Sequence, residues 1–148
     1  MRSYSQIKVF DQRAFDLFQA AEKCVAAIPD PKDVESLRCH EVARAVGRVL
    51  DLDVQDGRYG CVEHSWLWLE RYPPTPPTCL LDVYCVGRLP MVQLVDINCV
   101  LPHWRPLQKR SICSGYYPGE ARTDIREAVV RKLARAMLQV DRRVGVAP

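Results

Sequence analysis

The chain has 148 residues, of which 48% are hydrophobic and 26% charged, and its formal net charge is +3. This length and composition fit a single soluble domain spanning 1–148 and exclude a disordered chain. No apolar run approaches the roughly 18 residues of a membrane span, and no secretion signal is visible at the start. We therefore expect a cytoplasmic protein with no membrane partner, whose odd number of cysteines is reduced and mostly buried.

The first predicted element is a helix over about 11–27, where apolar residues recur at helical spacing. Two closely spaced prolines, Pro29 and Pro31, follow it and end it, because proline lacks an amide N–H and disfavours a helical residue before it.

A second predicted helix begins between Asp33 and Ser36, either of which can act as its N-cap, and runs to about Leu50. If Ser36 is the N-cap, Cys39 lies in the first turn, where backbone N–H groups have no partner within the helix. If the helix begins at Asp30, Cys39 lies in mid-helix. The sequence leaves both positions of Cys39 open.

Strands are predicted in the middle of the chain, where β-prone runs alternate with turn residues. Asp-Gly and Tyr-Gly pairs predict turns in 51–60, with at most a short strand at 52–54. The proline-rich segment 72–77 predicts a stiff hairpin loop. The three main predicted strands are 62–69, 78–86 and 91–96.

The last third of the chain is predicted to be irregular over 98–119 and helical over about 124–140. Asp124 and Glu127 have the spacing of a capping pair for this last helix. One face of the helix carries several basic residues but no aromatic ones, which favours a solvated face and makes a nucleic-acid partner unlikely. The predicted fold class is thus α+β, with helices packed on an antiparallel sheet.

Three residue types suited to thiol catalysis occur in order in this frame: Cys39 on the second helix, His64 on the first main strand and Asp82 on the next. A thiol nucleophile needs a base, and the base needs a carboxylate that fixes its tautomer and stabilises its cation. A hairpin loop centred on Pro73 pairs position 64 with position 82, on the same face of the sheet. We therefore predict a hydrogen bond between His64 and Asp82, with Cys39 close by.

The ordered trio and the local pattern His64-Ser65-Trp66-Leu67 resemble the transglutaminase-like branch of the papain-fold cysteine enzymes. The resemblance covers about 36–96, and it departs from the family just before Cys39, where Glu35-Ser36-Leu37-Arg38 replaces an aromatic or glycine-rich stretch. It implies a papain-like core and a thiol acyl-transfer enzyme, either a cysteine peptidase or a transglutaminase, that acts on a peptide or protein without a cofactor.

Other interpretations of the same residues stay open. Trp66, beside Trp68, is a candidate substrate-binding residue, although packing of both aromatics against the nucleophile helix is the favoured interpretation. His103 and Asp96 are alternative acid–base partners. A non-catalytic binding or assembly protein with the same fold is the main alternative function.

A zinc-binding module is a further alternative, because Cys61 and His64 have a short ligand-like spacing. The pair would need two more ligands from elsewhere, and no second clean pair is present. We therefore predict no metal site and no zinc requirement for folding. The candidate additional ligands are Cys39, His40, His103 and Cys113.

Overall fold

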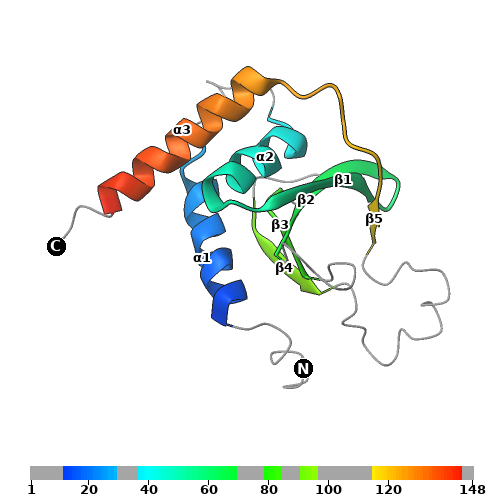
Figure 1. Ribbon diagram of the computed structural model, residues 1–148, viewed down its shortest axis with the longest axis horizontal. Coiled ribbons are helices and arrows are strands. Elements are labelled where there is room, and N and C mark those ends of the chain that lie inside the picture. The colour runs from blue at the N-terminus through cyan, green and yellow to red at the C-terminus, as the bar shows by residue number, and fades with distance from the viewer. Residues whose placement is uncertain (1–11, 30–36, 70–78, 85–90, 97–114, 145–148) are drawn as a thin grey trace.

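The computed structural model describes residues 12–29, 37–69, 79–84, 91–96 and 115–144. These segments form an α+β fold in which three helices pack on a curled antiparallel sheet (Figure 1). No helix within the described segments combines the length and apolar character needed to cross a membrane.

The helices are α1 (Gln12–Ala26), α2 (Cys39–Leu50) and α3 (Glu127–Val144). Helix α2 lies between the sheet and the other two helices (Figure 1), and it packs against α1, α3, β1 and β2. Its buried face is correspondingly wide and built from small and β-branched residues: Val42, Ala43, Ala45, Val46 and Gly47. The start of α2 is thereby held at a fixed place over the sheet.

The sheet contains β1 (Asp53–Tyr59), β2 (Val62–Trp68), β3 (Cys79–Asp82), β4 (Gln93–Asp96) and β5 (Tyr116–Pro118). Their order is β4-β3-β2-β1-β5, and every neighbouring pair is antiparallel. The strands β1 and β2 form a tight hairpin in which Tyr59 pairs with Val62 and Gly60 has a positive φ of 60°. The first four strands therefore lie side by side in chain order, whereas β5 joins β1 from far along the chain.

Each face of the sheet has its own apolar cluster. Leu67 and Leu81 face the helices and join the main core, whereas Trp66, Leu80 and Tyr116 pack together on the other face. This alternation follows from the period of two along a strand. His64 is two residues from Trp66 and therefore lies on the same face of the sheet, away from the helices. Ser65 is two residues from Leu67 and lies on the face towards the helices.

Several predicted elements are confirmed with small changes of boundary. The first helix, 11–27, is Gln12–Ala26, and the strands 62–69, 78–86 and 91–96 are present as shorter segments. The last helix begins three residues later than predicted, at Glu127, with Arg126 accepting the first helical hydrogen bonds. The capping pair was wrong, because Asp124 instead bonds to Arg38 and Arg122.

Two predicted irregular regions contain strands. The Asp56-Gly57 pair was expected to form a turn, but it lies inside β1, whose seven residues pair fully with β2. Residues 116–118, expected to be irregular, form β5. Residues 70–78, which include the proline-rich loop, lie outside the described residues, as do 97–114.

Gly57 is required where β1 and β5 meet. A Cβ at this position would lie 2.0 Å from the carbonyl oxygen of Tyr117 and 2.8 Å from a ring carbon of Trp66. We expect Gly57→Ala to lower the free energy of unfolding by about 2–4 kcal/mol, because backbone cannot move aside cheaply. Urea unfolding followed by circular dichroism measures this loss. Gly60→Asn is the control, since Gly60 has open space and asparagine tolerates positive φ; equal losses in both variants would contradict the account.

Candidate active site

Cys39 is the first residue of α2. Arg38 precedes it as the N-cap with an extended backbone, φ −113° and ψ 146°, and the carbonyl of Arg38 accepts from the N–H groups of Glu41 and Val42. The helix begins later than the predicted range Asp33–Ser36, so Cys39 lies in the first turn. The first N–H groups of a helix have no intrahelical acceptor and carry partial positive charge, which favours a thiolate at this position.

His64 and Asp82 form the predicted hydrogen bond, with 2.8 Å between Nε2 of His64 and Oδ2 of Asp82. Both side chains are almost completely buried, at 1% and 3% exposed. Asp82 also accepts from the hydroxyl of Tyr116 at 2.7 Å and from the backbone N–H of Tyr84 at 3.1 Å. These bonds fix the carboxylate, which in turn fixes the imidazole ring.

The register between β2 and β3 differs from the predicted one without separating these residues. Leu67 pairs with Leu81 and Trp68 with Leu80, which places Asp82 opposite Trp66 and diagonal to His64. The predicted pairing of position 64 with position 82 was therefore wrong by two residues. A shift of two keeps every side chain on its face, whereas a shift of one would have reversed them.

Cys39 and His64 are linked electrostatically. Burial raises the pKa of the Cys39 thiol, but hydrogen bonds and charge from His40 and His64 outweigh it and bring the pKa to about 6. Burial also lowers the pKa of His64, but hydrogen bonds and charge from Asp82 and Cys39 outweigh that and bring the pKa to about 9. The two shifts favour a thiolate on Cys39 and a protonated ring on His64 between about pH 6 and about pH 9.

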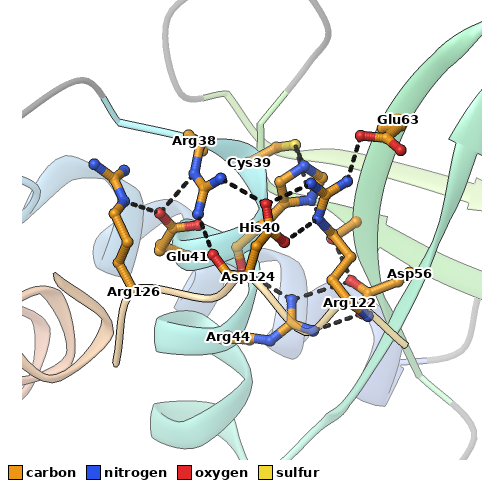
Figure 2. Close-up of polar contacts among 11 residues, drawn as sticks. Arg38, Cys39, His40, Glu41, Arg44, Asp56, Glu63, Arg122, Asp124 and Arg126 are labelled. Atoms are coloured by element: carbon orange, nitrogen blue, oxygen red, sulfur yellow. Dashed lines mark hydrogen bonds and ion pairs between the residues drawn. The ribbon is translucent and has the colours of Figure 1, made fainter. Parts of the chain in front are cut away.

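A second buried network reaches Cys39 from the helix-facing side of the sheet. The sulfur of Cys39 lies 3.6 Å from Nδ1 and 3.8 Å from Nε2 of His40 (Figure 2). Nδ1 of His40 is 2.7 Å from Oγ of Ser65, which donates to Oδ1 of Asp56 at 2.5 Å. Arg44 of α2 binds both oxygens of Asp56, at 3.0 and 2.5 Å.

This second network was missed as a catalytic candidate in the sequence. His40 was considered only as a zinc ligand, and Asp56 was assigned to a turn. The available signal was the spacing of His40 and Arg44, which lie four residues apart on one helix face. That spacing does not reveal the carboxylate that both residues contact, because Asp56 lies on β1 beyond residue 54, where the possible short strand was expected to end.

Charged residues tie the start of α2 to the start of α3. Glu41 is completely buried, and its Oε1 accepts from Nε of Arg38 at 2.8 Å and from Nε of Arg126 at 2.5 Å (Figure 2). Arg38 reaches Asp124 as well, at 3.1 Å. The position of Cys39 is therefore fixed by contacts on both sides of it along the chain.

The remaining candidate residues are not drawn into the site. Trp66 is fully buried among Trp68, Leu80 and Tyr116 on the face away from the helices, and its Nε1 has no hydrogen-bond partner among the described residues. The alternative that these aromatics pack against the nucleophile helix is therefore wrong for Trp66, and its substrate contact stays a prediction. His103 lies outside the described residues, and nothing is described of the Asp96 side chain.

The described residues include no cluster of three or more side chains able to ligate a metal ion. Cys61 is exposed, whereas His64 is buried and bonded to Asp82. Cys113 and His103, two of the possible additional ligands, fall in 97–114, outside the described residues. The absence of a zinc requirement stays a prediction.

Searches against protein-family models, curated proteins and solved structures return no match for this chain.

Asp56 is the most heavily bonded carboxylate of the site, and its removal should destabilise the fold. Burial raises the pKa of Asp56, but bonds from Arg44, the N–H of Arg122 and Ser65 outweigh it and lower the pKa to about 2. We expect Asp56→Asn to cost about 3 kcal/mol of unfolding free energy, because it leaves Arg44 with a poorly matched partner. Asp53→Asn, at an exposed position of the same strand, should change it by less than about 0.5 kcal/mol.

The lowered pKa of Asp56 makes the stability of the fold depend on pH. A carboxyl whose folded pKa lies below its unfolded value stabilises the protein above the unfolded pKa and loses that contribution as pH falls towards the folded one. The difference in stability between wild type and Asp56→Asn should therefore shrink between pH of about 4 and about 2. A difference that stays constant over this range in chemical unfolding would contradict the assigned ion pair.

Proposed function

We propose that this protein is a thiol-dependent acyl-transfer enzyme with a transglutaminase-like, papain-type core, in which Cys39 is the nucleophile, His64 the general base and acid, and Asp82 the residue that orients His64. The observation that carries the proposal is the buried His64–Asp82 hydrogen bond. The imidazole of His64 also lowers the pKa of Cys39, the first residue of a helix.

Attack begins from the thiolate. The Cys39 sulfur adds to the carbonyl carbon of an amide or ester, and the carbonyl electron pair moves onto oxygen. As the first N–H of α2, the N–H of Cys39 has no acceptor within the helix, and in this mechanism it donates to that oxyanion. Since this donor belongs to the backbone, it is set by the fold and needs no reorganisation during the reaction.

Collapse of the tetrahedral intermediate breaks the bond to the leaving group. His64, protonated on its Cys39 side, gives its proton to the departing amine, and a thioester on Cys39 remains. Asp82 stabilises the imidazolium before this transfer and holds the ring in place after it. Water or a primary amine then gives a proton to His64 and attacks the thioester, which releases the acyl product and restores the thiolate.

The choice of acyl acceptor decides between hydrolysis and transamidation. Hydrolysis and transamidation use the same residues in the mechanism above. They differ only in whether water or an amine accepts the acyl group, which is varied by adding an amine to the reaction. A peptide or protein is the substrate class that the resemblance implies, and no cofactor is needed for these steps.

An activated ester tests the nucleophile directly. p-Nitrophenyl acetate should transfer one acetyl group to Cys39, which peptide mapping by mass spectrometry locates. His64→Asn should slow this acylation by about 100-fold or more, and Asp82→Asn by a smaller factor, because a correctly held base is lost in each. Cys61→Ser is the matched control, because Cys61 is an exposed thiol that the mechanism does not use. Acetylation of another cysteine, or an unchanged rate in His64→Asn, would contradict the assignment.

The pH profile is predicted by the two shifted groups. The thiolate of Cys39 forms as pH rises through about 6, and the imidazolium of His64 is lost as pH rises through about 9. Alkylation of Cys39 by iodoacetamide, which needs only the thiolate, should therefore rise through a midpoint near pH 6. A midpoint at the ordinary thiol value of about 8.5 would refute the ion pair.

A further inference from the structure

Asp82 accepts two side-chain hydrogen bonds on the same carboxylate oxygen. Nε2 of His64 lies 2.8 Å from Oδ2, and the hydroxyl oxygen of Tyr116 lies 2.7 Å from it. The other oxygen, Oδ1, accepts from the backbone N–H of Tyr84 at 3.1 Å. Asp82 is ionised in the mechanism above, and an ionised carboxylate offers only acceptors, so His64 and Tyr116 both donate to Oδ2.

Tyr116 reaches this oxygen from a distant strand of the sheet. It belongs to β5, and the strands β1 and β2 lie between β5 and β3 in the sheet order. The curl of the sheet (Figure 1) and the length of the tyrosine side chain together bridge that separation. The ring of Tyr116 makes edge-to-face contacts with Tyr59, at 4.9 Å between centroids, and with Trp66, at 5.3 Å. These contacts hold the ring without help from its hydroxyl.

The hydroxyl of Tyr116 acts on His64 through Asp82. A hydrogen bond donated to a carboxylate stabilises its ionised form and makes it a weaker base. The positive end of the hydroxyl dipole also lies at Oδ2, where the ring N–H of His64 is bonded. Both effects disfavour the positive charge on the His64 ring. All three side chains are at least 94% buried, so water does not screen these interactions.

We propose that Tyr116 is a positioning residue of the site, whose hydroxyl reduces the negative charge on Oδ2 of Asp82 and so keeps the His64 imidazolium acidic enough to give up its proton. The inference rests on the acyl-transfer function proposed above, in which that proton goes to the leaving amine. An imidazolium held too strongly by its carboxylate is a poor acid, so Tyr116 assists the step that breaks the amide bond.

The other titratable groups around His64 come from two elements. Helix α2 contributes Cys39, whose sulfur is in turn contacted by the ring of His40. Strand β1 contributes Tyr59, whose ring centroid lies 6.3 Å from that of His64. The residue of β4 that pairs with Asp82 is uncharged. Within the described residues, the hydroxyl of Tyr116 is thus the group that can adjust the charge of Asp82 without itself being charged.

The test compares variants that each remove one group. Tyr116→Phe removes the hydroxyl and keeps the ring. Tyr59→Phe is the matched control, because the two tyrosines belong to one aromatic cluster but the hydroxyl bonded to Asp82 is that of Tyr116. Asp82→Asn removes the carboxylate charge and gives the direction of the opposite effect. The measurement is nitrogen NMR of the His64 ring in the full chain, titrated from pH 5 to pH 11 and assigned by comparison with His64→Asn.

We expect the midpoint of the His64 titration to rise by about half a pH unit in Tyr116→Phe, to fall in Asp82→Asn and to stay within about 0.2 of wild type in Tyr59→Phe. If Tyr116 served only to hold the carboxylate in place, its loss would weaken the His64–Asp82 bond and lower the midpoint, as in Asp82→Asn. A fall or no change in folded Tyr116→Phe therefore overturns the proposal.

A second variant keeps the test decisive if Tyr116→Phe does not fold. Replacement of Tyr116 alone by 3-fluorotyrosine keeps the hydroxyl and makes it a stronger hydrogen-bond donor, so the His64 midpoint should fall below that of wild type. A midpoint that rises or stays unchanged with this analogue overturns the proposal.

The failures of the two proposals are distinguishable, because the NMR titration does not depend on acyl transfer. If Cys39 takes no acetyl group from p-nitrophenyl acetate but the His64 midpoint rises in Tyr116→Phe, the acyl-transfer function fails and the effect of Tyr116 on His64 stands. If Cys39 is acetylated and the midpoint does not rise in folded Tyr116→Phe, the role of Tyr116 alone fails.

Discussion

The carboxylate of Asp56 is the interaction on which the arrangement of the site most depends. From the middle of β1 it binds Arg44 of α2, Ser65 of β2 and the backbone of Arg122 before α3. Its own carbonyl accepts from the N–H of Gly119, just after β5. One buried residue thus joins the central helix, two strands and the segment that leads to the last helix, and the loss of any partner leaves a buried charge or polar group unsatisfied.

This junction explains how the start of a helix can hold a cysteine against the ring of His40. The Asp56 network fixes α2 along its length through Arg44 and fixes His40 through Ser65. A separate network, in which Tyr116 and His64 both bond to Asp82, comes from β5, β2 and β3 on the other face of the sheet. Since adjacent residues of β2 point to opposite faces, the strand serves both networks at once.

The sequence predicted the structure correctly where the spacing of residues along one element was enough to decide it. Alternation along two strands placed His64 and Asp82 on one face, and that result survived a two-residue error in register because the period of a strand is two. The start of α2 was less predictable, because Arg38 makes no side-chain cap and so leaves no capping signal. Asp56-Gly57 has the composition of a turn, and only pairing with both neighbouring strands makes it extended. Long-range contacts of that kind leave no local pattern.

The central claim is that a thiolate and an imidazolium face each other at neutral pH, and nitrogen NMR of the His64 ring measures this directly. The account predicts that, in wild-type protein at pH 7.5, both ring nitrogens of His64 are protonated and titrate only as pH approaches about 9. In Cys39→Ser the ring should titrate at a lower pH, because the thiolate that stabilises its charge is absent. A His64 ring that is neutral at pH 7.5 in wild type, with a titration unchanged by Cys39→Ser, would contradict the account.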